Sequence, residues 1–196
     1  SPTINKNLGN VNIRLPDVIL DQETRITDLK IPAALSFATL NNINKVIYNK
    51  GKKHLGIIST GKAFSDTMDC LKNLNIDQKK AEKLGIHLLK IGMTWPLESK
   101  KIEDFSRNMR EVIVIEEKRD FLETNIKNIL YNKKDMPKNI VGKLDENGNR
   151  LIKEGYEINK TDLKHVLISR IEKTCKVDLK VMSTSYQSSV KTVSKK

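Results

Sequence analysis

Residues 55–133 repeat one pattern three times: a short apolar run, then a stretch with the spacing of an amphipathic helix. The three apolar runs are LGIIST, IHLLKIG and EVIVI. Runs this short and this apolar predict strands buried on both faces, and the helical stretches between them predict crossover connections. The pattern therefore predicts an α/β fold, with three α/β/α layers around a mostly parallel sheet of about five strands.

Weaker patterns flank this core. Apolar spacing predicts a helix over residues 31–48, and residues 139–143 predict a short edge strand. Asn147-Gly148 marks a turn. Thr161-Asp162 predicts the cap of a last helix that ends near Lys173.

The chain is divided into three parts on this basis. Residues 1–30 are interpreted as a linker or N-terminal arm that wraps onto the domain, residues 31–175 as the α/β domain, and residues 176–196 as a mobile Ser- and Lys-rich tail or linker. The chain begins with serine, which suggests a processed or excised piece.

Candidate functional residues follow the ends of the three predicted strands. In parallel sheets, the loops that leave the carboxyl ends of strands hold most ligand and contact sites. We expect these loops to contact a neighbouring domain or an anionic group, through Thr60, Gly61, Lys62, Thr94, Trp95, Pro96, Glu116 and Glu117.

The first loop resembles a nucleotide-binding P-loop only superficially. Residues 56–62 fit G-x-x-x-x-G-K, but Ala63 stands where Ser or Thr would hold Mg²⁺. The residues between the two glycines also read as a strand. We interpret Gly61 as a tight strand-to-helix turn that leaves a helix N-terminus facing a neighbour.

The other chemical patterns are weak. Glu116 and Glu117 are adjacent in a strand, so their side chains face opposite ways and do not form an acid/base pair; Glu116 is interpreted as a cap or a contact to a neighbouring domain. The histidines are isolated, and Cys70 and Cys175 lack metal-ligand spacing. We expect no metal site, and a reducing, cytoplasmic location.

Composition adds a net charge of +12. The lysines are spread along the whole chain and few aromatic residues lie among them, so we interpret the charge as solvated helix faces and do not favour a nucleic-acid partner. The charge would suit an acidic partner. No apolar run has the length of a membrane span, so no membrane contact is expected.

Three segments, in order, resemble indolepyruvate ferredoxin oxidoreductase: LGIISTGKAFSDTMDCL, GIHLLKIGMTWPLE and IEDFSRNMREVIVIEEKRDFLETNIKNILY. The resemblance is to the middle region of the long, fused bacterial form, which is similar in fold to the C-terminal domain of transketolase. Residues 12–17 and 140–145 are similar to the segments entering and leaving that region. The resemblance covers roughly residues 10–175.

The resemblance implies a whole enzyme that oxidatively decarboxylates aryl 2-oxo acids. Thiamine diphosphate with Mg²⁺ carries the chemistry, iron–sulfur clusters and ferredoxin take the electrons, and coenzyme A takes the acyl group. This chain lacks the family's Gly-Asp-Gly diphosphate motif and the clustered cysteines of an iron–sulfur site. We therefore expect no cofactor and no catalytic residue in this part of the enzyme.

The resemblance assigns an architectural role to the chain. It would pack on the thiamine pyrimidine and diphosphate domains of the same polypeptide, within a homo-oligomer, and would itself carry no catalytic residue. Lys62 would meet an anion such as a coenzyme phosphate. Trp95 has a second interpretation, as a partly buried aromatic held in a turn by Pro96.

Two alternatives remain open. One is a domain of another 2-oxo acid:ferredoxin oxidoreductase, since this domain does not read the substrate. The other is a stand-alone basic binding module, for which binding to arbitrary DNA would depend steeply on salt.

Overall fold

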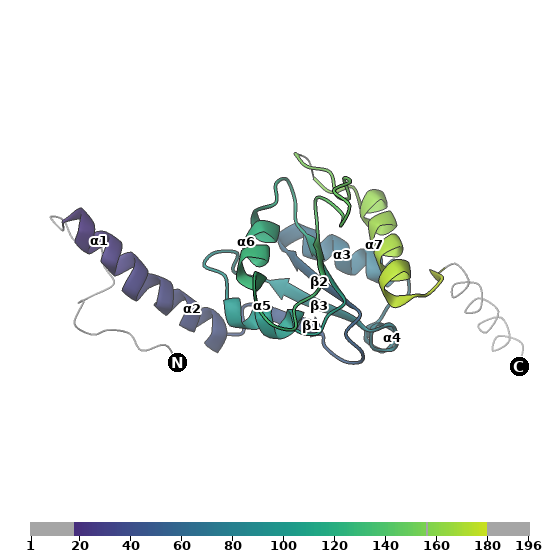
Figure 1. Cartoon of the computed structure of the whole chain (residues 1–196), viewed down its shortest axis with the longest axis horizontal. Helices are drawn as coiled ribbons and strands as arrows, with labels where there is room; N and C mark the ends of the chain where they lie inside the picture. The colour runs from purple at the N-terminus through teal and green to yellow at the C-terminus, as the bar shows by residue number, and fades with distance from the viewer. Residues whose placement is uncertain (1–17, 156, 180–196) are drawn as a thin grey trace, which may run out of the picture.

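A five-stranded sheet forms the centre of the computed structural model, which describes residues 18–155 and 157–179 (Figure 1). The expectations for residues 1–17 and for the Ser- and Lys-rich tail from residue 180 on lie outside this range. The strand order is β1-β3-β2-β4-β5. The strands are β1 (Lys45–Tyr48), β2 (Leu55–Thr60), β3 (Ile86–Ile91), β4 (Glu111–Ile115) and β5 (Asn139–Val141).

The sheet is mostly parallel, as the sequence predicts. Strand β2 lies between β3 and β4 and pairs in parallel with both, and β5 pairs in parallel with β4. Only β1 runs antiparallel, at the edge beside β3. The central strands are buried almost throughout because helices cover both of their faces.

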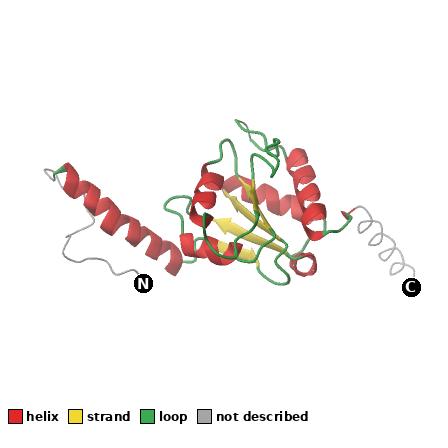
Figure 2. Ribbon diagram, in the orientation of Figure 1, coloured by secondary structure: helices red, strands yellow, loops and turns green. Residues whose placement is uncertain are grey.

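Helices form a layer on each face of the sheet (Figure 2). One apolar core joins the sheet to α3 (Gly61–Asn73), α4 (Gln78–Leu84) and α7 (Lys160–Cys175). A second core joins the opposite face to α5 (Ser99–Ser106) and α6 (Phe121–Leu130). The three-layer α/β/α class predicted from the alternating pattern is confirmed.

A helical arm precedes the sheet and runs away from it (Figure 1). The arm, defined here as residues 19–40, consists of α1 (Ile19–Arg25), the π-helical turn η2 (Ile26–Lys30) and α2 (Ile31–Leu40). In α2 only Ser36 and Thr39 are polar. Phe37 and Leu40 are nonetheless 59% and 78% exposed. A helix that is apolar all round is normally buried, so this arm presents an unusual apolar surface.

The predicted helix over residues 31–48 is wrong in its last part. The helix ends at Leu40, Asn42 takes a left-handed φ of 47°, and Lys45–Tyr48 form β1. Asparagine tolerates that conformation, and the following Val46-Ile47 pair favours a strand. The boundary between residues 30 and 31 also falls inside a continuous helix.

The C-terminal expectations are mostly confirmed. The edge strand is β5, and the turn closes with the Asp145 amide and carbonyl bonded to Asn149 and Gly148. The last helix begins one residue before Thr161, and its cap is Asn159, whose side chain accepts a hydrogen bond from the Thr161 amide at 2.8 Å. The predicted Thr161-Asp162 cap is therefore wrong. Within the described ranges, no helix is long and apolar enough to cross a membrane.

Candidate functional site

The three candidate loops lie along one edge of the sheet. They follow β2, β3 and β4, which are parallel neighbours, so their carboxyl ends meet at the same edge. The Thr60 hydroxyl donates to the Ile91 carbonyl at 2.9 Å and ties the end of β2 to the end of β3. The sequence therefore predicts this juxtaposition of loops correctly.

Lys62 lies among carboxylates at this edge. Its Nζ atom is 3.0 Å from Asp66, 3.5 Å from Glu117 and 3.6 Å from Glu157. The hydrogen bond that the Lys62 ammonium donates to Asp66 is the main reason why the pKa of Lys62 is raised. The ammonium group is thus already surrounded by negative charge, so an incoming anion would have to displace these carboxylates.

Asp66 is the buried centre of this cluster. Burial favours its neutral form, but ion pairs from Lys62 and from Lys160, at 3.3 Å, outweigh burial and leave the pKa of Asp66 lowered. Lys160 is the first residue of α7. The cluster therefore joins the start of α3 to the start of α7.

Gly61 makes the turn from β2 into α3 with a φ of 54°. An added Cβ atom would meet nothing within 4 Å, so the turn opens to solvent. The backbone conformation, rather than lack of room, therefore explains the glycine.

Glu116 caps α6. Its two carboxylate oxygens accept hydrogen bonds from the amides of Leu122 and Glu123, both at 2.7 Å. Burial raises the pKa of Glu116, and these two hydrogen bonds partly oppose the rise. A carboxylate at a helix N-terminus is favourably placed, and this one is buried by the chain's own structure. Glu117 faces Lys62 instead, so the two adjacent glutamates have separate partners.

The buried Lys143 side chain supports the loop that contains Glu116. Lys143 donates from Nζ to the Glu116 carbonyl at 2.6 Å, and its backbone amide donates to Glu123 Oε2 at 2.8 Å. Burial lowers the pKa of Lys143, although Glu116 and Glu123 favour its charged form. Gly142 permits this approach, because a Cβ atom there would lie 2.2 Å from Glu123 Oε2.

Asn44 and Glu98 hold the third loop. Asn44 Oδ1 accepts from the amides of Gly92 and Met93 at 2.9 and 3.1 Å, just before Trp95. Its Nδ2 atom donates to Glu98, whose other oxygen accepts from the Thr39 hydroxyl in α2 at 3.0 Å. Both residues are buried. This network therefore fixes the β3 loop against the base of the arm.

Trp95 itself points outward. It is 61% exposed and joins Pro96 through a cis peptide bond. The interpretation of Trp95 as a partly buried aromatic is not what the structure shows. An exposed tryptophan is suited to contact another surface.

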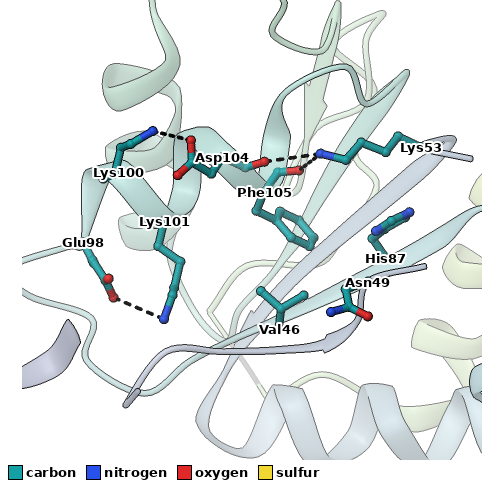
Figure 3. Close-up of a pocket in the computed structure, with 9 residues that line it drawn as sticks. All are labelled: Val46, Asn49, Lys53, His87, Glu98, Lys100, Lys101, Asp104 and Phe105. Atoms are coloured by element: carbon teal, nitrogen blue, oxygen red, sulfur yellow. Dashed lines mark hydrogen bonds and ion pairs between the residues drawn. The ribbon is translucent and has the colours of Figure 1, made fainter. Parts of the chain in front are cut away.

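A pocket of about 340 Å³ lies between β1 and α5 (Figure 3). Val46 and Phe105 supply its apolar surface. Its cations are already paired: Lys53 donates to carbonyls at the end of α5, Lys100 to Asp104, and Lys101 to Asn44 and Glu98. The pocket therefore offers no unpaired cation to a charged ligand.

The histidines and cysteines of the described residues form no metal site. No group of three His, Cys, Asp or Glu side chains among them could hold a metal ion. Cys70 and Cys175 are buried, and burial raises the pKa of the Cys175 thiol to about 11. His87 and His54 bond backbone carbonyls. These side chains serve packing and backbone pairing.

Sequence reasoning thus found the loops but missed their supports. It missed Asn44, Glu98 and Lys143, because a buried polar residue whose partner is distant in sequence leaves no periodic pattern. Gly142 lies in a segment that the resemblance includes, yet its contact with Glu123 could not be read from the chain.

The chain matches the model of a known protein family. A model described as "Indolepyruvate oxidoreductase domain" matches residues 45–191, most of the chain. The match begins at β1, just after the arm.

Curated relatives are longer proteins. The chain is similar to indolepyruvate oxidoreductase subunit IorA of Methanothermobacter thermautotrophicus, with 24% identity over 127 residues, covering 65% of this chain and 18% of that protein. It is similar to the Archaeoglobus fulgidus subunit of the same name, with 33% identity over 79 residues, 40% of this chain and 11% of that protein. The chain spans less than a fifth of the length of these relatives.

Two solved structures have related arrangements. One is a 2-oxoglutarate:ferredoxin oxidoreductase from Magnetococcus marinus, with a TM-score of 0.48 and 16% identity, covering 79% of this chain and 24% of that one. The other is a split-gene transketolase, with a TM-score of 0.46 and 15% identity, covering 69% of this chain and 42% of that one.

Proposed function

This chain belongs to the indolepyruvate oxidoreductase domain family, and we propose that it is a non-catalytic interface domain of a longer indolepyruvate:ferredoxin oxidoreductase. The longer enzyme would decarboxylate an aryl 2-oxo acid with thiamine diphosphate, Mg²⁺ and iron–sulfur clusters. Coenzyme A and ferredoxin would be its other partners. The substrate rests on the family name, so a different 2-oxo acid remains an alternative.

The residues of this chain do not fit those cofactors. An iron–sulfur cluster takes several accessible thiolates, whereas Cys70 and Cys175 are buried and the pKa of each thiol is raised by burial. Glu116 uses both carboxylate oxygens to cap α6. The cofactors would therefore be bound by other parts of the enzyme.

The observation that carries the proposal is the contrast between charged and apolar groups. Lys62, Glu116 and Glu117 are engaged with other residues of the chain, whereas Trp95, Phe37 and Leu40 are exposed. Contiguous exposed apolar surface marks contacts with other protein. We propose that the arm and the Trp95 loop pack on neighbouring thiamine domains or on a second subunit of a homo-oligomer.

We propose that Lys62 contacts carboxylates of its own chain in the first place and an incoming anion only in competition with them. Its three carboxylate neighbours make it a member of a charge network at the interface. A coenzyme phosphate would have to compete with Asp66 for Lys62. If Lys62 serves only the ion pairs with its three carboxylate neighbours, Lys62→Ala would leave the coenzyme A dependence of the longer enzyme unchanged.

The test compares exposed aromatic residues in the longer enzyme. Trp95→Ala and Phe37→Ala should loosen its assembly, measured as a lower thermal midpoint and a shifted sedimentation coefficient. Tyr131→Ala is the control, because Tyr131 is 75% exposed but lies at the far end of α6. Equal effects of all three substitutions would refute the interface role.

Calorimetry tests the non-catalytic role separately. The isolated chain should bind no thiamine diphosphate in the presence of Mg²⁺. Stoichiometric binding would show that this domain holds the cofactor itself.

A further inference from the structure

A groove of about 740 Å³ lies between α3 and α4. Its apolar lining comes from Tyr48, Met68 and Ile76, of which Met68 is half-buried while Tyr48 and Ile76 are 8% and 1% exposed. Four lysines line it: Lys72, Lys79, Lys80 and Lys83. The groove thus combines an apolar lining with a strongly basic rim.

The acidic residues of the groove are already engaged. The Asp77 side chain caps α4 by accepting from the Lys80 amide at 2.8 Å. Asp69 pairs with Lys160 at 2.7 Å. Within the described part of the chain, Lys72, Lys79 and Lys83 form no ion pair, and the four lysines outnumber the two aspartates that line the groove.

Helix stability does not explain Lys79 and Lys80. Lys79 and Lys80 lie in the first turn of α4, which contains no acidic residue. The N-terminus of a helix carries partial positive charge, so cations there are unfavourable. Lys79 and Lys83 are also four residues apart on the same helix, a spacing at which like charges repel. A negatively charged partner would relieve both effects.

The groove lies away from the candidate loops. Helix α3 begins at the carboxyl end of β2 and runs back, and α4 leads into the amino end of β3. The groove is therefore at the opposite edge of the sheet from the Trp95 and Lys62 loops, and its role goes beyond the interface proposed above.

We propose that the α3–α4 groove binds an acidic segment of a partner protein. An apolar side chain of the segment would contact Met68, the half-buried apolar residue of the lining, and its carboxylates would face the four lysines. A protein suits the groove better than a nucleic acid, because bases stack on exposed aromatic faces and Tyr48, the aromatic residue of this groove, is only 8% exposed.

The test measures fluorescence anisotropy with the full chain at low salt. The probe is a labelled peptide of glutamates around one central leucine. Comparison probes replace the glutamates by glutamines, or the leucine by serine, and a single-stranded DNA oligonucleotide is the third. Only the glutamate–leucine peptide should bind tightly, and added salt should weaken its binding.

Two matched variants locate the site. Lys79→Glu with Lys83→Glu should weaken peptide binding by about tenfold or more. Lys134→Glu with Lys138→Glu makes the same change of charge on exposed lysines beyond α6 and should change it by less than about twofold. Circular dichroism checks that both variants fold.

Four results would overturn the proposal. They are absence of saturable peptide binding, equal loss in both variants, equal binding of the glutamine peptide, and DNA binding tighter than the peptide through the same two lysines. The last result would assign the groove to nucleic acid.

Discussion

The Asn44 amide donates to the Glu98 carboxylate at 3.1 Å, between residues 54 positions apart in the chain. The pair joins four parts of the structure: the base of the arm, the edge strand β1, the loop after β3 and the start of α5. Asn44 is 1% exposed and Glu98 8%. Because both side chains are buried and bonded on several sides, the Trp95 loop is held in place by the interior rather than by its own turn residues.

Removing Asn44 should therefore destabilise the domain. Asn44→Ala leaves the amides of Gly92 and Met93 and one oxygen of Glu98 without their partner. Unsatisfied buried polar groups make a loss of about 2–4 kcal/mol in the free energy of unfolding the expected result. Urea unfolding measures it. Asn73→Ala, at an exposed site in α3, is the control and should change the free energy by less than about 0.5 kcal/mol.

Gly142 makes room for the Glu123 carboxylate. In Gly142→Ala the new Cβ atom would lie 2.2 Å from Glu123 Oε2 and 3.1 Å from the Val114 carbonyl. Glu123 would have to leave the Lys143 amide, so we expect a loss of about 2–3 kcal/mol. Gly148→Ala has open space but a φ of 81° and should lose only about 1 kcal/mol. Chemical denaturation of both variants compares the two effects, and an equal loss would rule out the steric explanation.

The sequence predicts best the strands that are buried on both faces, because their residues are apolar throughout. Strands β2, β3 and β4 are short apolar runs because helices cover both faces. Because they are parallel neighbours, the Thr60, Thr94 and Glu116 loops lie at the same edge of the sheet. The edge strand β1 has four residues and an uneven burial pattern, so it reads as the continuation of an apolar helix.

Buried polar residues are what the sequence cannot reveal. Lysine is almost always exposed, so nothing in the chain marks Lys143 as buried until Glu116 and Glu123 are seen beside it. The exposure of Trp95 is equally hidden, because the same Thr-Trp-Pro turn could face inward or outward. The Asn44 hydrogen bonds that hold this loop are likewise not visible in the sequence.

Removing one partner of the buried ion pair between Glu111 and Arg170 should destabilise the domain more than replacing both partners by apolar residues. Arg170 Nε lies 2.7 Å from Glu111 Oε1, a second guanidinium nitrogen contacts the other oxygen, and both side chains are 4% exposed. Arg170→Met leaves the buried Glu111 carboxylate without its cation, although the Thr174 hydroxyl still donates to it at 3.4 Å, and removes one of the two cations that pair with Glu146. It should lower the free energy of unfolding by about 3–5 kcal/mol.

The double variant Glu111→Leu with Arg170→Met tests that explanation. It should recover a large part of the loss, because no unpaired charge remains among these two side chains. A double variant less stable than Arg170→Met alone would show that the pair itself stabilises the fold. Thermal or urea unfolding of the two single variants and the double variant completes the cycle.

The stability of the domain should fall as the pH drops below neutrality, through two histidines. Burial lowers the pKa of His87, and Lys53 adds to the effect although a hydrogen bond to Lys52 opposes it; burial and then Arg110 lower the pKa of His54. The unfolded chain therefore takes up protons first, near pH 6.5, and is stabilised relative to the folded chain as the pH falls below that value. Each histidine contributes at most about 1.4 kcal/mol per pH unit, until the pH reaches its folded pKa.

Urea unfolding between about pH 7.5 and 5.5 should show this decline in stability, and His87→Gln should make the free energy of unfolding depend less steeply on pH. An unchanged slope in that variant would contradict the assignment to His87.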